Sequence, residues 1–278
     1  MKSNKEILYN ESLAKKLEIY LDLIRKPVGI KFLYSEQEFN DFDSYTKDTA
    51  MPYCTMVRNA TLGQSLKAKA INFACHTGAK ALVVMDVTQD DISGQRHADK
   101  GVYKDLSISR IVHKDMVYCQ RKAYGIGIKP LENYSINPDI VIVITSGYGI
   151  MRLVQGNAFH FGQTKNIKLT GMNAICQECT SYPYKINDIN ISALCSGSRY
   201  VCQWKKDELG IGIPFNKLSY IIDGIVRTSN PMDRNEDKIR IEKSKTDINI
   251  GIKEEILYNQ NYYTGGYKSY KSNKLNLS

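Results

Sequence analysis

Four cysteines offer the clearest chemistry in this chain of 278 residues. They form two pairs of similar spacing, Cys54 with Cys75 and Cys176 with Cys195, which are 21 and 19 positions apart. In each pair the first cysteine opens a short helical pattern, and the second ends a strand-like stretch that runs into a glycine turn. Thiolates from two such units suit an iron–sulfur cluster or a tetrahedral zinc ion. The sequence therefore predicts a metal site at these four cysteines.

A 4Fe–4S cluster is the favoured form of this site, and zinc is the second choice. Only Cys176 and Cys179 have the close spacing of compact metal-binding motifs, so the site depends on the fold to bring distant thiols together. Cys176 and Cys179 alone could instead form a redox dithiol, although no thioredoxin-like pattern surrounds them. Cys119 and Cys202 are interpreted as small buried apolar groups.

Residues beside the cysteines predict how a substrate would be held. His76 follows Cys75 and is a candidate metal ligand, general base or donor to a cluster sulfide, and with Arg199 it forms the candidate catalytic pair. Arg199 and Arg58 are candidates for binding a small anionic substrate, since a guanidinium can pair with a carboxylate or phosphate. Two glycines of the turns would present backbone N–H groups to the cofactor, Gly78 and Gly197. The plain structural alternatives are a loop histidine bonded to backbone and solvated or salt-bridged arginines.

Two units of helix and strand must position these residues. The patterns predict helices over 10–25, 55–62 and 149–155 and from 216 onward, and strands over 28–33, 70–74, 124–128, 140–144 and 189–194. The apolar strand over 140–144 is typical of a central strand buried on both faces. The segment 86–116 is charged and contains glycines, which suggests a long functional loop or lid.

Alternating helices and strands predict an α/β or α+β fold with two pseudo-symmetric halves. We expect one globular domain over 1–232, built from related halves of about 1–133 and 134–232. Residues 233–278 are rich in Lys, Asn, Ser and Tyr, and they are interpreted as a polar C-terminal appendage.

Composition restricts the partners and the compartment. Apolar residues make up 42% of the chain and charged residues 24%, as in ordinary globular proteins. The longest apolar run is too short to cross a bilayer, and the N-terminus lacks the features of a secretion signal, so we expect a cytoplasmic protein without a membrane partner. Seven cysteines cannot all pair within one chain. A net charge of +9 suggests a nucleic-acid partner. The lysines are scattered along the chain, however, so this partner is disfavoured.

Several short motifs together resemble the prokaryotic family catalogued as domain of unknown function 169. The matching stretches lie at 26–31, 54–63, 75–79, 137–141, 190–199 and 213–214. The resemblance implies a cytoplasmic protein of anaerobes or archaea, a setting compatible with oxygen-sensitive clusters, and it transfers no activity. The sequence departs from the family at His76 and Thr77, where smaller residues are expected, and the tail lies outside the resemblance.

The main functional hypothesis is redox or sulfur chemistry on a small anionic substrate at a cysteine-bound metal centre, with a small-molecule ligand or an electron-transfer partner. One alternative is a non-catalytic protein that binds and delivers a small molecule or metallocofactor. A third is a nucleic-acid-binding protein. Whether the chain is an enzyme stays open at this point, because no phosphate-binding loop, dinucleotide fingerprint or nucleophile elbow occurs in it.

Overall fold

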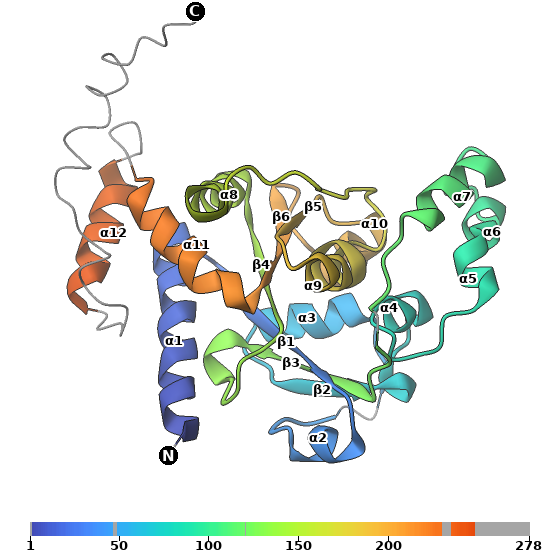
Figure 1. Cartoon of the computed structure of the whole chain (residues 1–278), viewed down its shortest axis with the longest axis horizontal. Coiled ribbons are helices and arrows are strands. Elements are labelled where there is room, and N and C mark those ends of the chain that lie inside the picture. Colours follow the sequence, from blue (N-terminus) through green and yellow to red (C-terminus); the bar gives the residue numbers. More distant parts are fainter. Residues whose placement is uncertain (1, 47–48, 120, 230–234, 248–278) are drawn as a thin grey trace, which may run out of the picture.

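The computed structural model describes residues 2–46, 49–119, 121–229 and 235–247, and in them helices flank both faces of one six-stranded sheet (Figure 1). The strands are β1 (Val28–Leu33), β2 (Leu66–Lys69), β3 (Gly125–Pro130), β4 (Ile140–Ser146), β5 (Asn190–Ser192) and β6 (Glu208–Pro214). The longer helices are α1 (Lys2–Leu21), α3 (Tyr53–Thr61), α7 (Leu106–Lys114), α8 (Gly147–Phe161), the π-helix η3 (Ala174–Ser181), α11 (Phe215–Arg227) and α12 (Asn235–Asp247). The shorter ones are α2 (Glu36–Asp41), η1 (Ala70–Asn72), α4 (His76–Ala81), α5 (Gln89–Ser93), α6 (Gln95–Asp99), η2 (Leu131–Asn133), α9 (Tyr182–Ile186) and α10 (Ser196–Cys202). The predicted class, α/β or α+β, is confirmed.

The strand order of the sheet is symmetric. It reads β2-β3-β1-β4-β6-β5, and each neighbouring pair is antiparallel. The first three strands of the chain occupy one half in the order β2-β3-β1, and the last three occupy the other half in the reversed order β4-β6-β5. A two-fold rotation perpendicular to the sheet therefore exchanges β1 with β4, β2 with β5 and β3 with β6.

The register of the strands obeys the same rotation. Gly29 pairs with Val141 where the halves meet. The rotation carries the residue pair on one side of this contact onto the pair on the other side. Each half also pairs the first residue of its inner strand with a proline of the adjacent strand, Val28 with Pro130 and Ile140 with Pro214. The symmetry thus extends from strand order to individual residue positions.

One face of the sheet carries most of the sulfur in the chain. Side chains of β1 and β4 alternate, and one set points into a core built with α3, α4, η3 and α10. Three cysteines belong to this core and three more pack against it. We call the layer formed by α3, α4, η3 and α10 the cysteine layer.

The opposite face is covered differently in the two halves. Over β4 and β6, the helices α1, α8 and α11 bury residues such as Val143 and Ile211. Over β1 and β3, the short helix α2 inserts Phe39 and Phe42, and an added Cβ at Gly127 would collide with the Phe42 ring. Glycine in β3 therefore makes room for two aromatic rings on this face.

A Gly-Ile-Gly-Ile sequence occurs in both β3 and β6, at 125–128 and 210–213. The two-fold rotation superimposes β3 on β6, but the two sequence copies within these strands are offset from each other by one residue. Ile126 and Ile128 face the cysteine layer in β3, whereas Gly210 and Gly212 face it in β6. Because β6 presents only glycines there, η3 packs directly on its backbone.

The segment predicted as a loop or lid, 86–116, forms the three short helices α5, α6 and α7. Figure 1 shows them projecting together from one end of the molecule. Local hydrogen bonds explain why they form: Thr88 and Asp91 make a capping box at the start of α5, and the Asp105 side chain accepts a bond from the Ile108 backbone N–H at the start of α7.

The strand predicted over 70–74 is wrong. Residues 70–72 form a 3₁₀ turn, and β2 ends at Lys69. The Asn72 side chain accepts a hydrogen bond from the Lys69 backbone N–H at 2.9 Å, which turns the chain, and Ile71 is 77% exposed. The strand β6 was not predicted. The predicted tail over 233–278 lies largely outside the described residues, apart from α12. In the described part of the chain, no helix combines the length and apolar character that crossing a membrane requires.

Candidate functional site in the cysteine layer

The four cysteines predicted as ligands all lie at or near helix starts. Cys75 and Cys195 are the N-cap residues of α4 and α10, Cys54 is the second residue of α3, and Cys176 is the third residue of η3. The N-terminus of a helix carries partial positive charge, which favours a thiolate. The two-fold rotation relates α3 to η3 and α4 to α10, so each half contributes two thiols to the layer.

Cys176 lies at the centre of this arrangement. Burial raises the pKa of the Cys176 thiol well above its ordinary value, and the nearby thiols of Cys75, Cys195 and Cys54 raise it further. The structure therefore brings the four predicted cysteines into one electrostatic neighbourhood. Within the described residues, however, no three His, Cys, Asp or Glu side chains stand close enough together to hold a metal ion.

The backbone before Cys195 is strained. Leu194 has φ +62°, in the left-handed region that branched side chains rarely adopt. The Cys195 sulfur then accepts a hydrogen bond from the Ser198 backbone N–H at 3.4 Å. Strain of this kind is concentrated at functional sites, where surrounding structure maintains it.

The π-helix that carries Cys176 is also unusual. Its N-cap, Asn173, has φ +51°, and π-helical turns occur often at functional sites. The Glu178 carboxylate within it is buried and accepts hydrogen bonds from the Thr170 backbone N–H at 2.7 Å and the Ser192 hydroxyl at 2.5 Å. These bonds attach η3 to β5 and to the preceding loop, and they hold Cys176 in place.

The thiols of Cys54 and Cys202 influence each other's pKa. The Cys202 side chain has the largest effect on the pKa of Cys54 and lowers it. Bonds from Thr55 lower this pKa further, although burial opposes the change. The Cys54 side chain, together with burial, raises the pKa of Cys202. The two thiols therefore differ in how readily they ionise, and Cys54 ionises more readily than Cys202. Sequence reasoning missed Cys202, because the pair requires α3 and α10 to pack against each other.

Cys179 does not form an accessible dithiol with Cys176. It is fully buried, and an added Cβ at Gly210 would lie 3.0 Å from its sulfur. Burial raises the pKa of Cys179 well above its ordinary value. The Cys179 side chain therefore fills the space between η3 and β6, and the structure gives the two-cysteine redox interpretation no support.

The two predicted substrate-binding arginines differ in their surroundings. Arg199 donates hydrogen bonds to the backbone carbonyls of Lys205, Ala193 and Glu208 at 2.6, 2.9 and 2.9 Å. Its guanidinium is therefore occupied in holding the loop between α10 and β6. In contrast, the buried Nε of Arg58 has no hydrogen-bond partner in the described part of the chain, and Arg58 lies near enough to Cys202 to favour its thiolate.

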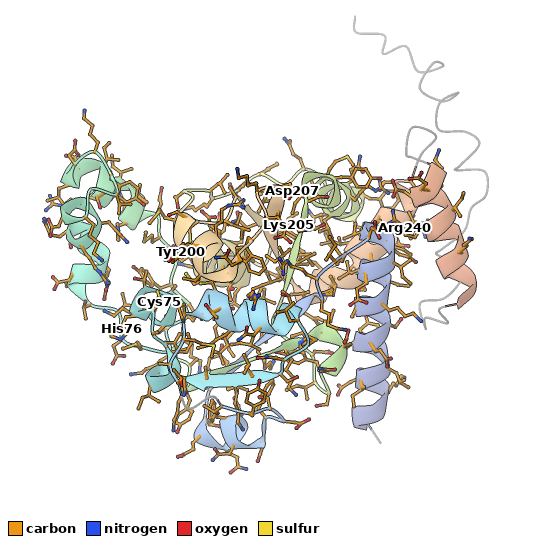
Figure 2. The ribbon with its side chains drawn as sticks, turned by 180° about the vertical axis from the view of Figure 1, so that it is seen from behind. Cys75, His76, Tyr200, Lys205, Asp207 and Arg240 are labelled. Carbon is orange, nitrogen blue, oxygen red and sulfur yellow. The ribbon has the colours of Figure 1, made fainter. Side chains whose placement is uncertain are left out.

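The remaining predicted residues lie at the outer side of the layer. Figure 2 shows Cys75 and His76 next to each other at the edge of the molecule, and both side chains are exposed. Gly78 is buried, and a Cβ there would lie 3.4 Å from the Cβ of Tyr53. Gly197 has open space around it. Gly78 therefore serves close packing of α4, whereas Gly197 leaves backbone accessible at the start of α10.

A cavity of about 460 Å³ occupies another region of the molecule, and no cysteine lines it. It lies where Lys205, Asp207 and Arg240 are labelled in Figure 2. Residues that line the cavity form ion pairs with one another, including Arg25 with Glu208, whose Nε and Oε1 atoms are 2.6 Å apart. The charges of this cavity are largely satisfied within the protein, and the chemistry of the cysteine layer is separate from it.

The chain is similar to known proteins over most of its length. The model of the family DUF169, described as Uncharacterised ArCR, matches residues 16–224. The chain is similar to the relative named Uncharacterized protein MJ0308 of Methanocaldococcus jannaschii, with 25% identity over 214 residues, or 76% of this chain and 91% of the relative. No solved structure matches the chain. The four predicted cysteines fall inside the matched range, and α12 falls outside it.

Proposed function

The chain belongs to the DUF169 family, and from this premise we propose that it acts through its cysteine layer, as a protein that binds a soft metal centre for redox or sulfur chemistry. One observation carries the proposal: each half of the sheet delivers two thiols to the neighbourhood of Cys176. The ligands are Cys54, Cys75, Cys176 and Cys195. A reducing, cytoplasmic setting would keep these thiols free.

The donor set fits such a centre in type and number. Four thiolates are the usual ligands of an iron–sulfur cluster, the favoured form, and they also suit a structural zinc ion. Mutual repulsion among the thiols, which opposes ionisation of Cys176, would be relieved by a bound cation. The ligands stand farther apart in this structure than they would around a metal, so binding requires the four side chains to close in. A bound cluster would supply electron transfer or sulfur activation.

Arg58 is the residue that best fits a small anionic substrate. Its orphaned Nε is buried beside the thiols, and a buried donor without a partner is costly unless a ligand satisfies it. A carboxylate, phosphate or sulfur oxyanion would provide the acceptor. Arg199 is already bonded to three carbonyls, so we assign it no substrate contact. His76, exposed beside Cys75, would exchange protons with solvent.

Metal and sulfide analysis tests the proposal. Protein purified without oxygen, or reconstituted with iron and sulfide, should contain close to one centre per chain and show the absorption of thiolate-bound iron. Cys176→Ser should lower the metal content at least tenfold, since Cys176 is the central thiol. Cys119→Ser is the matched control, because Cys119 is a buried cysteine of the same core outside the ligand set.

A wild-type protein that binds neither iron nor zinc after reconstitution would refute the metal centre. So would a Cys119→Ser variant that loses as much metal as Cys176→Ser while remaining folded by circular dichroism. Retention of metal by Cys119→Ser, together with its loss from Cys176→Ser, supports the assignment of ligands.

A further inference from the structure

A second cavity, of about 240 Å³, lies between α7, the segment that follows α8, and the π-helix η3. Apolar side chains form most of its wall: Ile111, Val112, Met116, Val117 and Leu169. Ile111 is 62% exposed and Leu169 is 53% exposed, so the mouth of the cavity presents apolar surface to solvent. Small-molecule sites in proteins combine such walls with a few fixed polar groups.

Gln177 is a polar residue of this cavity whose side chain has no partner among the described residues. The residue is only 8% exposed. Its backbone is satisfied, because its N–H donates to the Asn173 carbonyl at 2.8 Å and its carbonyl accepts from the Tyr182 N–H. No such bond reaches the side-chain amide in the described part of the chain. A buried amide without a partner is costly, and a ligand in the cavity would supply the missing bonds.

The other polar side chains along the wall are already bonded. The Tyr182 hydroxyl donates to a backbone carbonyl at 2.6 Å, and the Thr170 hydroxyl has two acceptors within reach. The Lys168 ammonium donates to the Asp115 carbonyl at 3.1 Å and lies 3.5 Å from the Asp115 carboxylate. Gln177 is therefore the group that remains to recognise a ligand.

Glu178 sets the charge of the cavity wall. One of its carboxylate oxygens accepts hydrogen bonds from the backbone N–H groups of Thr170 and Gly171 at 2.7 and 3.2 Å, and the other accepts from the Ser192 hydroxyl at 2.5 Å. Every one of these partners is a donor, as a carboxylate requires. An anion would be repelled here, and the apolar wall penalises a cation. The cavity therefore suits an uncharged ligand.

We propose that this cavity binds a small, flat, uncharged cyclic amide, in which a ring N–H lies beside a ring carbonyl, and that Gln177 recognises this edge. The glutamine side chain carries an acceptor oxygen and an NH₂ donor, so it can form two parallel hydrogen bonds with such an edge. The apolar wall contacts the faces of the ring. The cavity is smaller than the roughly 300–1,000 Å³ of pockets for drug-sized ligands, which favours a ligand of one or two rings.

This inference goes beyond the metal centre and does not depend on it. Gln177 follows Cys176 in η3, but the residues that line the cavity all lie outside the four-cysteine ligand set. A protein that never binds metal would still bind the cyclic amide. Conversely, a metal-binding protein that does not bind the cyclic amide would refute only the ligand assigned to this cavity.

Carbostyril, a cyclic amide of two fused rings, is the probe. N-methylcarbostyril is the matched control compound, because the methyl group removes the N–H donor and keeps the rings. An NMR titration of the full-length protein should give a dissociation constant on the order of 1 mM or tighter for carbostyril. N-methylcarbostyril should bind at least about tenfold more weakly, since it leaves the amide partly unpaired.

Two variants assign the recognition to Gln177. Gln177→Leu keeps a side chain of similar size without the amide, so its affinities for the two compounds should agree within about twofold. Gln37→Leu, at an exposed position on α2, should retain the wild-type preference for carbostyril. A Gln177→Leu variant that folds and keeps the full preference would overturn the role of Gln177.

Hydrogen exchange locates the bound probe. Saturating carbostyril should slow exchange over both 106–117 and 168–178, because the cavity lies between these segments. Three outcomes for the wild-type protein would overturn the proposal: no binding of carbostyril, equal affinity for the two compounds, or protection confined to other segments. Because all three are read from the wild type, failure of a variant to fold does not affect the conclusion.

Discussion

Gly212 lies directly beneath the backbone of Cys179, so that a Cβ added to Gly212 would overlap the Cys179 carbonyl oxygen. No side chain separates β6 from η3 at this point. The position of the π-helix, and with it the position of Cys176, therefore depends on the absence of a single methyl group.

Replacing Gly212 should disturb the cysteine layer more than replacing a glycine at its edge. Gly212→Ala must push η3 away from β6, and overpacking of this kind costs roughly 1–3 kcal/mol of unfolding free energy. Gly197→Ala is the control, since a Cβ there meets open space in a helix, and it should leave stability unchanged or slightly increased. Urea unfolding of both variants measures the difference. Equal stability of the two would contradict the close approach.

Arg199 should prove to be a structural residue. Its three hydrogen bonds to backbone carbonyls require the planar guanidinium, which lysine cannot reproduce. We expect Arg199→Lys to lower the unfolding free energy by roughly 2 kcal/mol, while metal content and anion binding are retained in the folded protein. Arg96→Lys, at an exposed position, should leave stability, metal content and anion binding unchanged. If Arg199→Lys lost anion binding without loss of stability, the structural assignment would fall.

Lys16 gives the fold a dependence on alkaline pH. It is 3% exposed, and burial lowers its pKa from 10.5 to about 8, although Asp223 opposes the change. Between these two values the unfolded chain binds a proton that the folded chain lacks, so stability rises with pH across this window. At pH 7 both states are protonated, and the folded state bears the cost of a buried charge.

Lys16→Met should therefore stabilise the protein by roughly 2–3 kcal/mol at pH 7. The gain should decrease as the pH rises above 8 and disappear near the ordinary lysine pKa. Lys15→Met, at the adjacent exposed position, is the control and should show no such trend. Unfolding curves at pH 7, 8.5 and 10 make the comparison, and a gain independent of pH would contradict the assigned cause.

The helices α5–α7 should loosen in mild acid. His97 Nδ1 lies 2.6 Å from His113 Nε2, and His113 Nδ1 lies 2.8 Å from the Asp91 carbonyl oxygen. Burial lowers the pKa of His97, and His113, Arg96 and Lys100 lower it further. Because the folded state binds this proton less readily than the unfolded state, stability is lost as the pH falls below about 6.5.

Hydrogen exchange over residues 89–114 should consequently accelerate between pH 7 and pH 5.5, after correction for the intrinsic rate. His97→Gln should remove most of this extra acceleration, because the titrating ring is gone. His76→Gln, which changes an exposed histidine outside these helices, should leave it in place. Unchanged protection of the segment at pH 5.5 in the wild type would contradict the prediction.

The sequence predicted those elements whose apolar pattern the fold uses directly. The strand predicted over 28–33 has the observed bounds of β1, and the predicted inner face of α11, including Leu218 and Ile222, is buried. Local capping and periodicity decide such elements, and both are visible in sequence. The helix start at Cys54 follows from the same signals, whereas α4 and α10 begin after Cys75 and Cys195, where the sequence predicted only glycine turns.

Contacts between distant elements were beyond the reach of sequence patterns. The influence of Cys202 on the pKa of Cys54 depends on how α3 meets α10, and the position of η3 depends on its packing against β6. One signal was present and unused: the Gly-Ile-Gly-Ile copies at 125–128 and 210–213 mark β3 and β6 as related strands. Glycine-rich composition concealed β6, since glycine disfavours strands on average.

The reversed strand order has a consequence for how such a molecule can be assembled. A chain of half the length would leave the edge of β1 open, and a second copy could pair with that edge in the antiparallel sense around Gly29. Two identical subunits would then present four thiols around their shared axis. When both halves belong to one polypeptide, each can change its sequence independently of the other. Isoleucines of β3 can therefore face the cysteine layer in one half, while glycines of β6 face it in the other.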